Sequence, residues 1–337
     1  MVDNYDSGKE QSEMKKLAEE IIQGRRLNRQ DDLTVFLHAD LESLCQGANR
    51  IREMLQGSRV DMCSIVNGRS GRCSENCKFC AQSAHYNADC QVHGFLELSE
   101  LLEDCGNMAR QGVDRYSIVT SGRVMEGEDL EKSIAAYQAM HEKYPDMVLC
   151  ASHGLMSTED MKRLHDAGVF MYHTNVETSE RYFPEICTTH TYQDKLDQIQ
   201  RARDAGLEVC SGGIFGMGET WQDRLDMALL LSELEIYSIP MNFLLPIQGT
   251  PFADRPRLPQ EEIVRIVAVF RYINPDAYIR IAAGRSYFTD GGKLLFQSGA
   301  NAILTGDMLT TVGNGTVQDR EMLETMGFTL KEASVAI

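Results

Sequence analysis

Apolar positions along this chain follow two periods, one typical of helices and one typical of strands. From residue 60 onward, short runs rich in Val, Ile, Met and Tyr alternate with longer segments of amphipathic helical spacing. The short runs predict eight strands, at 60–66, 115–121, 147–152, 169–176, 208–215, 237–244, 278–283 and 302–305. The longer segments predict helices at 99–111, 130–143, 158–167, 192–205, 221–234, 259–270 and 291–298.

Strands that alternate with helices in this way predict a parallel α/β fold. Short βα repeats imply parallel strands joined by right-handed crossovers. Eight of them close into a (β/α)8 barrel of the TIM type, whose sites lie at the carboxyl ends of the strands. A doubly wound open sheet has the same order of elements, and spacing alone does not exclude it.

Amphipathic spacing at 13–25 and 40–56 predicts two more helices before the repeats begin. We therefore expect an N-terminal helical extension at 1–58, a barrel at 59–328 and a tail at 329–337. The helices of the extension are expected to cap one end of the barrel or to form a subunit contact.

Composition narrows the classes of partner. The chain has 337 residues, 43% of them hydrophobic, which is enough for a substantial core, and its net charge is −17. An excess of acidic residues argues against a nucleic-acid partner and against an anionic membrane. The N-terminus has no hydrophobic signal core, and no run reaches the 18 apolar residues of a membrane span. We expect a cytoplasmic protein, in which grouped cysteines indicate metal binding or catalysis before disulfides.

Three of the ten cysteines, Cys73, Cys77 and Cys80, lie within eight residues in the loop after the first strand. A four-iron cluster normally takes four cysteines, one for each iron. Three cysteines would leave one iron open for another ligand. The alternative is a zinc site completed by Cys63 or His85, although zinc pairs more often have the spacing Cys-x2-Cys.

Cys-x3-Cys-x2-Cys with Phe79 before its last cysteine resembles the signature of radical S-adenosylmethionine (SAM) enzymes. Further segments resemble the biotin synthase family; they lie at 67–71, 81–83, 209–220, 238–243 and 278–285. The resemblance as a whole extends from about residue 33 to residue 328. The resemblance implies a [4Fe-4S] cluster on the three cysteines. Its open iron would bind SAM, and one electron would cleave SAM to a 5′-deoxyadenosyl radical.

Residues near the ends of the fourth and fifth strands are candidates for SAM binding. Asn175 and Glu177 are two positions apart, so they face the same side. The family holds SAM at this position, usually with Asp; a solvated carboxylate at a strand end is the alternative. The glycine-rich segment 212–220 lacks the Lys of a phosphate-binding loop. The resemblance implies that its backbone approaches the adenine at Ile214, which is compatible with a turn in which Glu219 caps the next helix.

A second group of cysteines is expected inside the barrel. Cys150 and Cys210 fall in the third and fifth strands and Cys187 in the loop after the fourth, so three thiols can meet in the lumen, although a lone buried cysteine is most often a small hydrophobe. The resemblance implies an auxiliary iron–sulfur cluster that donates sulfur, held by cysteines on strands 2, 3 and 5 and an arginine on strand 7. Cys150, Cys210 and Arg280 match these positions, whereas Ser117 stands where the cysteine of strand 2 is expected.

We predict that Cys187 replaces the missing thiolate. The cluster would then be a [2Fe-2S] form or a four-iron form held by three cysteines, with an extra sulfide as the sulfur donor. Cys150, Cys187, Cys210 and Arg280 are accordingly predicted to be both metal ligands and catalytic residues. Arg280 paired with a nearby carboxylate is the alternative, and Cys63 is interpreted as a core residue.

The amide of Asn242, on the sixth strand, suits a cyclic urea, and Asn175 is expected to share in substrate binding. The resemblance implies a sulfurtransferase that inserts sulfur into dethiobiotin and consumes two SAM molecules for each biotin. It also implies flavodoxin or ferredoxin as reductant and a homodimer. The alternatives are another radical SAM enzyme, such as a hydrogenase-maturase-like protein or a carbon-skeleton mutase, and a non-enzymatic iron–sulfur carrier.

Overall fold

The computed structural model describes residues 7–309 and 313–333. Within these residues, nine parallel strands form one sheet in the order β5-β4-β3-β2-β1-β9-β8-β7-β6, and β5 also pairs with β7. The strands are β1 (Asp61–Arg69), β2 (Arg115–Thr120), β3 (Val148–Ser152), β4 (Val169–His173), β5 (Glu208–Cys210), β6 (Gly213–Phe215), β7 (Ser238–Phe243), β8 (Tyr278–Ile281) and β9 (Ala302–Leu304). The pairing of β5 with β7 closes the ring, so the predicted barrel is confirmed and the open sheet is excluded.

The extra strand arises because the predicted strand 208–215 is broken in two at Ser211 and Gly212. Its first half pairs with β4 and its second half with β7. A Cβ atom on Gly212 would lie 2.0 Å from the carbonyl oxygen of Pro240, so only glycine allows β7 to come this close. The architecture therefore has eight strands, the fifth of which is interrupted where the barrel closes.

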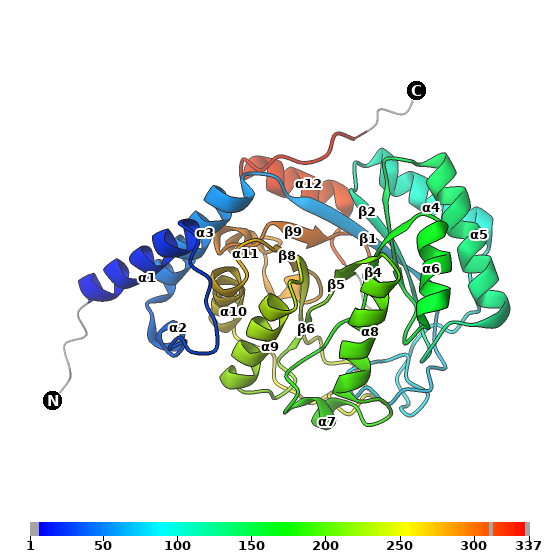
Figure 1. Cartoon of the computed structure of the whole chain (residues 1–337), viewed down its shortest axis with the longest axis horizontal. Helices are drawn as coiled ribbons and strands as arrows, with labels where there is room; N and C mark the ends of the chain where they lie inside the picture. Colours follow the sequence, from blue (N-terminus) through cyan, green and yellow to red (C-terminus); the bar gives the residue numbers. More distant parts are fainter. Residues whose placement is uncertain (1–6, 310–312, 334–337) are drawn as a thin grey trace.

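Helices surround the sheet (Figure 1). Those of the outer ring are α4 (Leu98–Arg110), α5 (Gly127–Lys143), α6 (Thr158–Asp166), α8 (Tyr192–Asp204), α9 (Trp221–Glu233), α10 (Gln260–Ile273) and α11 (Lys293–Gln297). Shorter or later elements are α7 (Phe183–Ile186), the 3-10 turn η1 (Arg285–Tyr287) and α12 (Thr316–Thr325). In the part of the chain described, no helix combines the length and the apolar character needed to cross a membrane.

The N-terminal extension contains α1 (Ser7–Ile22), α2 (Val35–His38) and α3 (Leu41–Gln56). In Figure 1 the blue helices lie on the outer side of the barrel, where α1 packs on α3 and α3 packs on α10. Tyr272 of α10 donates a hydrogen bond to the Met14 carbonyl, 3.1 Å away. The division at residues 58 and 328 stays a prediction, and residues 1–6 and 334–337 lie outside the described part.

Stability is expected to fall in acid because His153, which follows β3, is buried without charge. Its ring nitrogens contact the hydroxyls of Thr120, Ser133 and Tyr137 at 3.1–3.3 Å. Burial lowers the pKa of His153 from 6.5 to about 3. The unfolded chain therefore takes up this proton first as the pH falls below 6.5, which costs about 2 kcal/mol of stability by pH 5. Urea unfolding of the metal-free chain at pH 8 and pH 5 measures this loss of stability. In His153→Gln the loss should be smaller by about 2 kcal/mol. An unchanged loss would contradict the view that His153 is buried without charge.

Candidate active site in the barrel lumen

A cavity of about 370 Å³ runs through the lumen and collects most of the predicted site residues. Its lining includes the predicted residues Phe79, Cys80, Cys150, Asn175, Glu177, Cys210, Ile214, Asn242 and Arg280. Cys73, Cys77 and Cys187 are not part of this lining. Phe79 and Cys80 of the cysteine loop and the thiols on the barrel strands therefore face one shared space.

The loop that carries Cys73, Cys77 and Cys80 is ordered by its own backbone. The Cys73 N–H donates to the Gln82 carbonyl at 2.9 Å, and the Cys80 N–H donates to the Cys77 carbonyl at 3.0 Å. All three thiols are free and partly buried. Three soft sulfur donors in one short loop fit an iron–sulfur cluster. His85, a possible fourth ligand in the zinc alternative, has its Nε2 2.9 Å from the Ser74 carbonyl.

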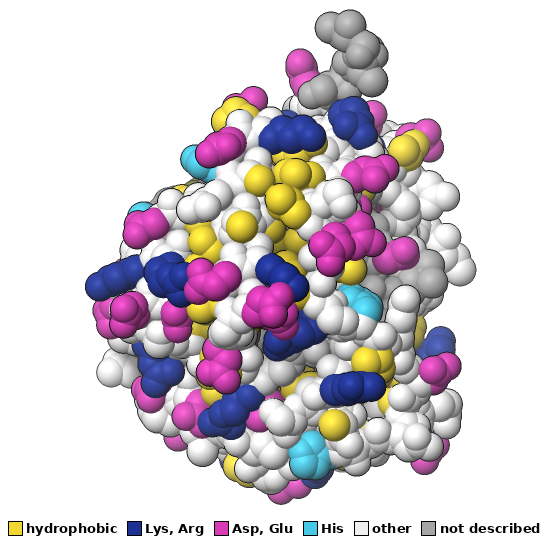
Figure 2. Space-filling view, turned by 90° about the vertical axis from the view of Figure 1, so that its right-hand side faces the viewer, with side chains coloured by type: hydrophobic (Ala, Val, Ile, Leu, Met, Phe, Trp, Pro, Cys, Tyr) yellow, Lys and Arg dark blue, Asp and Glu magenta, His cyan; other side chains and the backbone are white. Residues whose placement is uncertain are grey.

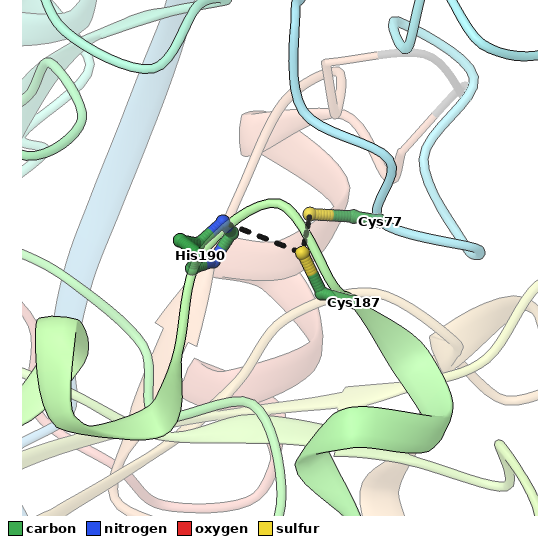
Figure 3. A group of neighbouring side chains, drawn as sticks. All are labelled: Cys77, Cys187 and His190. Carbon is green, nitrogen blue, oxygen red and sulfur yellow. Dashed lines mark hydrogen bonds between the residues drawn. The ribbon is translucent and has the colours of Figure 1, made fainter.

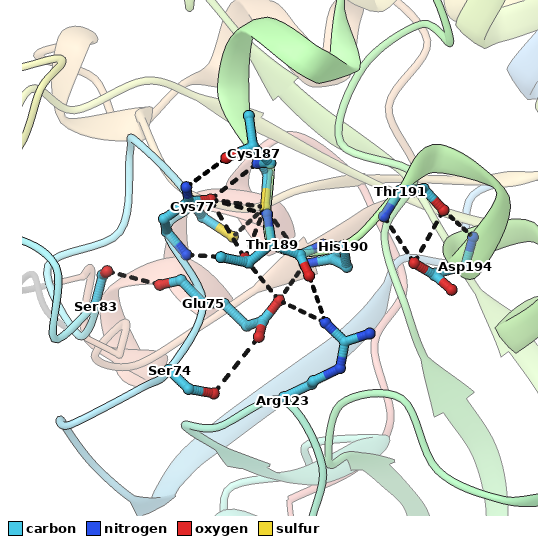
Figure 4. Close-up of polar contacts among 12 residues, drawn as sticks. Ser74, Glu75, Cys77, Ser83, Arg123, Cys187, Thr189, His190, Thr191 and Asp194 are labelled. Carbon is cyan, nitrogen blue, oxygen red and sulfur yellow. Dashed lines mark hydrogen bonds and ion pairs between the residues drawn. The ribbon is translucent and has the colours of Figure 1, made fainter.

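Glu75 fastens this loop to the segment that follows α7 (Figure 4). Its Oε2 accepts hydrogen bonds from Thr189 at 2.8 Å and His190 at 2.5 Å, and it pairs with Arg123 at 3.3 Å. Arg123 also donates to the Thr189 carbonyl at 2.6 Å. Burial on its own raises the pKa of Glu75, but the hydrogen bonds from His190 and Thr189 outweigh it and hold the pKa below the usual value. The position of the cysteine loop therefore depends on residues distant in sequence.

Cys187 lies beside this loop and not beside the thiols of the lumen. Its Sγ is 3.8 Å from Cys77 Sγ and 3.3 Å from His190 Nδ1, as Figure 3 shows. The hydrogen bond from Cys77 lowers the pKa of Cys187. Because the short helix α7 leads the chain to the cysteine loop, the structure does not bring Cys187 together with Cys150 and Cys210. The predicted role of Cys187 as their partner has no support from this geometry.

Asn175 and Glu177 lie just past the end of β4 and hold the broken fifth strand. The Asn175 Oδ1 accepts from the Gly212 N–H at 3.0 Å, and the Ile214 N–H donates to the Glu177 carbonyl at 2.9 Å. A Cβ atom on Gly213 would lie 2.4 Å from that same carbonyl oxygen. Glu177 has φ 69°, and its side chain accepts from Asn175 Nδ2 at 3.3 Å. Burial raises the pKa of Glu177, which faces the cavity and not bulk solvent.

Two other predicted residues have structural contacts as well. Glu219 accepts from the backbone N–H groups of Gly216 and Met217, both at 2.8 Å, and pairs with Arg224 at 2.8 Å. Glu219 therefore holds the glycine-rich turn. The expectation that it caps the next helix is wrong, because α9 is capped by Thr220, whose side chain accepts from the Asp223 N–H. Asn242 donates to the Gly213 carbonyl at 3.2 Å and accepts from the Ala283 N–H at 3.3 Å, while its side chain still lines the cavity.

The inner part of the cavity holds Cys150 on β3, Cys210 on β5 and Arg280 on β8, all buried. Ser238 donates to Cys210 Sγ at 3.2 Å. Arg280 pairs with Asp61 at 2.6 Å, so the carboxylate expected as the alternative partner of Arg280 is present. Arg280 as an iron ligand stays a prediction.

The contribution of β1 to the lumen was not predicted from the sequence. Cys63 was interpreted as a core residue, but it lines the cavity together with Ile65. Asp61 lies beneath them on the same strand, where Arg115 reaches it at 2.8 Å. Residues 61, 63 and 65 alternate on one face, so their period of two was the signal that could have identified them.

Comparison with known proteins agrees with this geometry. The description "Radical SAM superfamily" matches residues 69–231, and "Biotin and Thiamin Synthesis associated domain" matches residues 240–329. Biotin synthase of Clostridium beijerinckii is 57% identical over 94% of this chain and 100% of its own length. Biotin synthase of Alkaliphilus metalliredigens is 56% identical, also over 94% of this chain and 100% of its own length.

Solved structures support the fold. Methylornithine synthase superposes with a TM-score of 0.81 at 19% identity, covering 94% of this chain and 98% of that one. A maturase of the [FeFe]-hydrogenase superposes with a TM-score of 0.77 at 16% identity, covering 97% of this chain and 79% of that one. The sequence relatives identify the family within this fold: the chain belongs to the biotin synthases of the radical SAM superfamily.

Proposed function

We propose that this protein inserts sulfur between the methyl and methylene carbons of dethiobiotin to form biotin. One observation carries the proposal. A single cavity is lined by Phe79 and Cys80 of the cysteine loop and by Cys150, Cys210 and Arg280 of the inner barrel. A substrate in this cavity would lie between a radical source and a sulfur source. A carrier of electrons would need neither the cavity nor the inner thiols.

The protein uses SAM and an iron–sulfur cluster, as its family implies, and we propose that Cys73, Cys77 and Cys80 hold that cluster. When bound, this cluster would supply one electron to each of two SAM molecules. Each SAM would give methionine and a 5′-deoxyadenosyl radical, and each radical would remove one hydrogen atom from the substrate. Cys150, Cys210 and Arg280, with a further thiolate, would hold an auxiliary cluster, either [2Fe-2S] or a larger four-iron form. That cluster would supply the sulfide for two C–S bonds and take up the two electrons released.

The chain's own residues would orient the reactants and exclude water. Asn175 and Glu177 offer an amide and a carboxylate to the ribose and amino groups of SAM, and Phe79 and Ile214 offer apolar contact to its adenine. Asn242 retains hydrogen-bonding capacity for the urea ring of dethiobiotin, which Asn175 would share. Apolar residues line most of the remaining cavity and would keep water from the radical.

We also propose an external one-electron donor, flavodoxin or ferredoxin, and a homodimer. The net charge of −17 disfavours broad contact with an acidic donor, so docking would need a local basic patch. Figure 2 shows acidic and basic side chains interspersed on one face of the molecule. Such mixing allows small patches of either sign without a large field.

Anaerobic reconstitution with iron and sulfide, followed by SAM, a reductant and dethiobiotin, tests the proposal. We expect 5′-deoxyadenosine and biotin to form together, at about two to one by the two-SAM stoichiometry. A reaction without dethiobiotin is the control for uncoupled cleavage of SAM. Deoxyadenosine without biotin would favour a different radical SAM enzyme, and the absence of both would favour a carrier.

Glu177→Gln is expected to weaken SAM binding. The amide keeps the shape of the side chain but loses the charge that strengthens its hydrogen bonds, so the KM for SAM should rise about tenfold or more. Burial raises the pKa of Glu177. The affinity of the natural protein for SAM should therefore fall as the pH drops, at a pH above the pKa of an ordinary glutamate. The variant should lack this dependence. SAM affinity measured against pH in both proteins checks the assignment, which an unchanged KM would contradict.

A further inference from the structure

An unpartnered hydroxyl marks the inner end of the cavity. Ser117, on β2, is 4% exposed, lines the cavity, and its Oγ has no hydrogen-bond partner among the described residues. It lies directly opposite Cys150 in the register of β2 and β3. A buried polar atom without a partner is costly, so it points to a group that binds there. Ser117 is also where the resemblance predicts a thiolate that this chain lacks.

Cys63 brings a thiol to the same region from the neighbouring strand. In the register of β1 and β2, Ile65 lies opposite Ser117, and Cys63 is two residues before Ile65 on the same inner face. Its thiol is in electrostatic range of Cys150, Cys210 and Arg280. Its one hydrogen bond is a 3.8 Å contact to the adjacent Ser64 carbonyl. The sulfur is therefore free to take another partner.

The spacing of these thiols fits a multi-iron group better than a single ion. Among the described residues, one group of three ligand atoms that all lie within 4.8 Å of one another is found, at Cys77, Cys187 and His190. Cys63, Cys150 and Cys210 do not meet this limit, although all three line one cavity. Thiolates spread around a cavity in this way fit an iron–sulfur cluster. Each thiolate would then bind a different iron, or the three thiolates would be divided between two irons.

The charge at this end of the cavity also suits such a group. Arg280 and Arg115 both pair with the single carboxylate of Asp61, at 2.6 and 2.8 Å. Two guanidinium groups that share one carboxylate leave a positive charge in excess. Buried charges need compensation, and a cluster held by three thiolates is anionic. Asp61 and the two arginines therefore form a counter-charge beside the thiols.

We propose that Cys63 is the third thiolate ligand of the auxiliary cluster, together with Cys150 and Cys210. The inference rests on the proposed function, because it assigns a ligand to the cluster that donates sulfur. Cys63 replaces the cysteine expected at Ser117. The third ligand then comes from β1 and not from the segment that contains Cys187. The Ser117 hydroxyl would then hydrogen-bond to the cluster. A buried cysteine that only packs against Ala282 and Leu304 is the competing interpretation.

The test compares Cys63→Ala with Cys150→Ala, and with Cys45→Ala as a matched control from helix α3, outside the cavity. Each full-length protein is reconstituted without oxygen, and iron, sulfide and Mössbauer spectra are measured. We expect Cys63→Ala and Cys150→Ala to lose the same share of iron and sulfide and the same spectral component. Cys45→Ala should match the natural protein. The spectral component of the first cluster should persist in all three variants, which shows that the barrel has folded around that cluster.

A Cys63→Ala variant that keeps all its iron, sulfide and both spectral components would overturn the inference. If the spectral component of the auxiliary cluster is lost in Ser117→Ala but not in Cys63→Ala, the inference is overturned in favour of a serine ligand. Failure of the proposed function is separate: the natural protein itself would then contain a single type of cluster or make no biotin.

Discussion

Cys80→Ala is expected to abolish cleavage of SAM, with deoxyadenosine formation lowered by on the order of a thousandfold or more, equivalent to about 4 kcal/mol. The reason is that Cys80 belongs to the loop of three thiols and is its member that lines the cavity. Without it, one iron of the cluster loses its protein ligand. Deoxyadenosine measured after anaerobic reconstitution, together with iron content, gives the result.

Cys90→Ala is the matched control for this variant. Cys90 is a free, partly buried cysteine ten residues after Cys80, and it lies outside the cavity lining. It should keep the iron content and activity of the natural protein. Near-normal deoxyadenosine formation by Cys80→Ala would show that the three-cysteine loop does not hold the cluster that cleaves SAM.

Asp61→Asn is expected to lower the free energy of unfolding by about 3–5 kcal/mol, the usual cost of leaving a buried charge without its partner. Asp61 is 5% exposed and Arg280 3% exposed, so water cannot replace the lost carboxylate charge. Asparagine has nearly the same shape as aspartate, so the change in the free energy of unfolding reports the loss of the charge. Denaturant unfolding of the metal-free chain measures it.

Asp276→Asn provides the comparison on the surface. Asp276 pairs with Arg26 at 2.7 Å, but both side chains are more than 40% exposed. Exposed pairs contribute at most about 1 kcal/mol, so this variant should be nearly neutral. Equal effects of the two substitutions would contradict the view that Asp61 neutralises a buried positive end of the barrel.

The barrel could be predicted from sequence because each strand and helix is a local pattern. The break between β5 and β6 could not be. It exists because Gly212 lets Pro240 of β7 come within contact distance, and Pro240 is distant in sequence. Periodicity identifies an element, whereas its interruption depends on what packs against it.

The first cysteine group was predictable for the same reason: its members lie within one loop. The second group was predicted only in part. Cys150 and Cys210 lie on strands, and strand order placed them near each other correctly. Cys187 follows a strand, and helix α7, which the pattern did not predict, leads it to Cys77 instead. Cys63 was passed over because a single cysteine in an apolar strand resembles any core residue.

The central claim is that the barrel itself supplies the sulfur that enters dethiobiotin, and labelled sulfide tests it most directly. The protein is reconstituted with iron and ³⁴S-sulfide, freed of excess sulfide, and allowed to turn over with SAM, reductant and dethiobiotin. Mass spectrometry of the product then measures the origin of its sulfur. We expect ³⁴S-biotin in an amount no greater than one per auxiliary cluster. Biotin that carries unlabelled sulfur would contradict it.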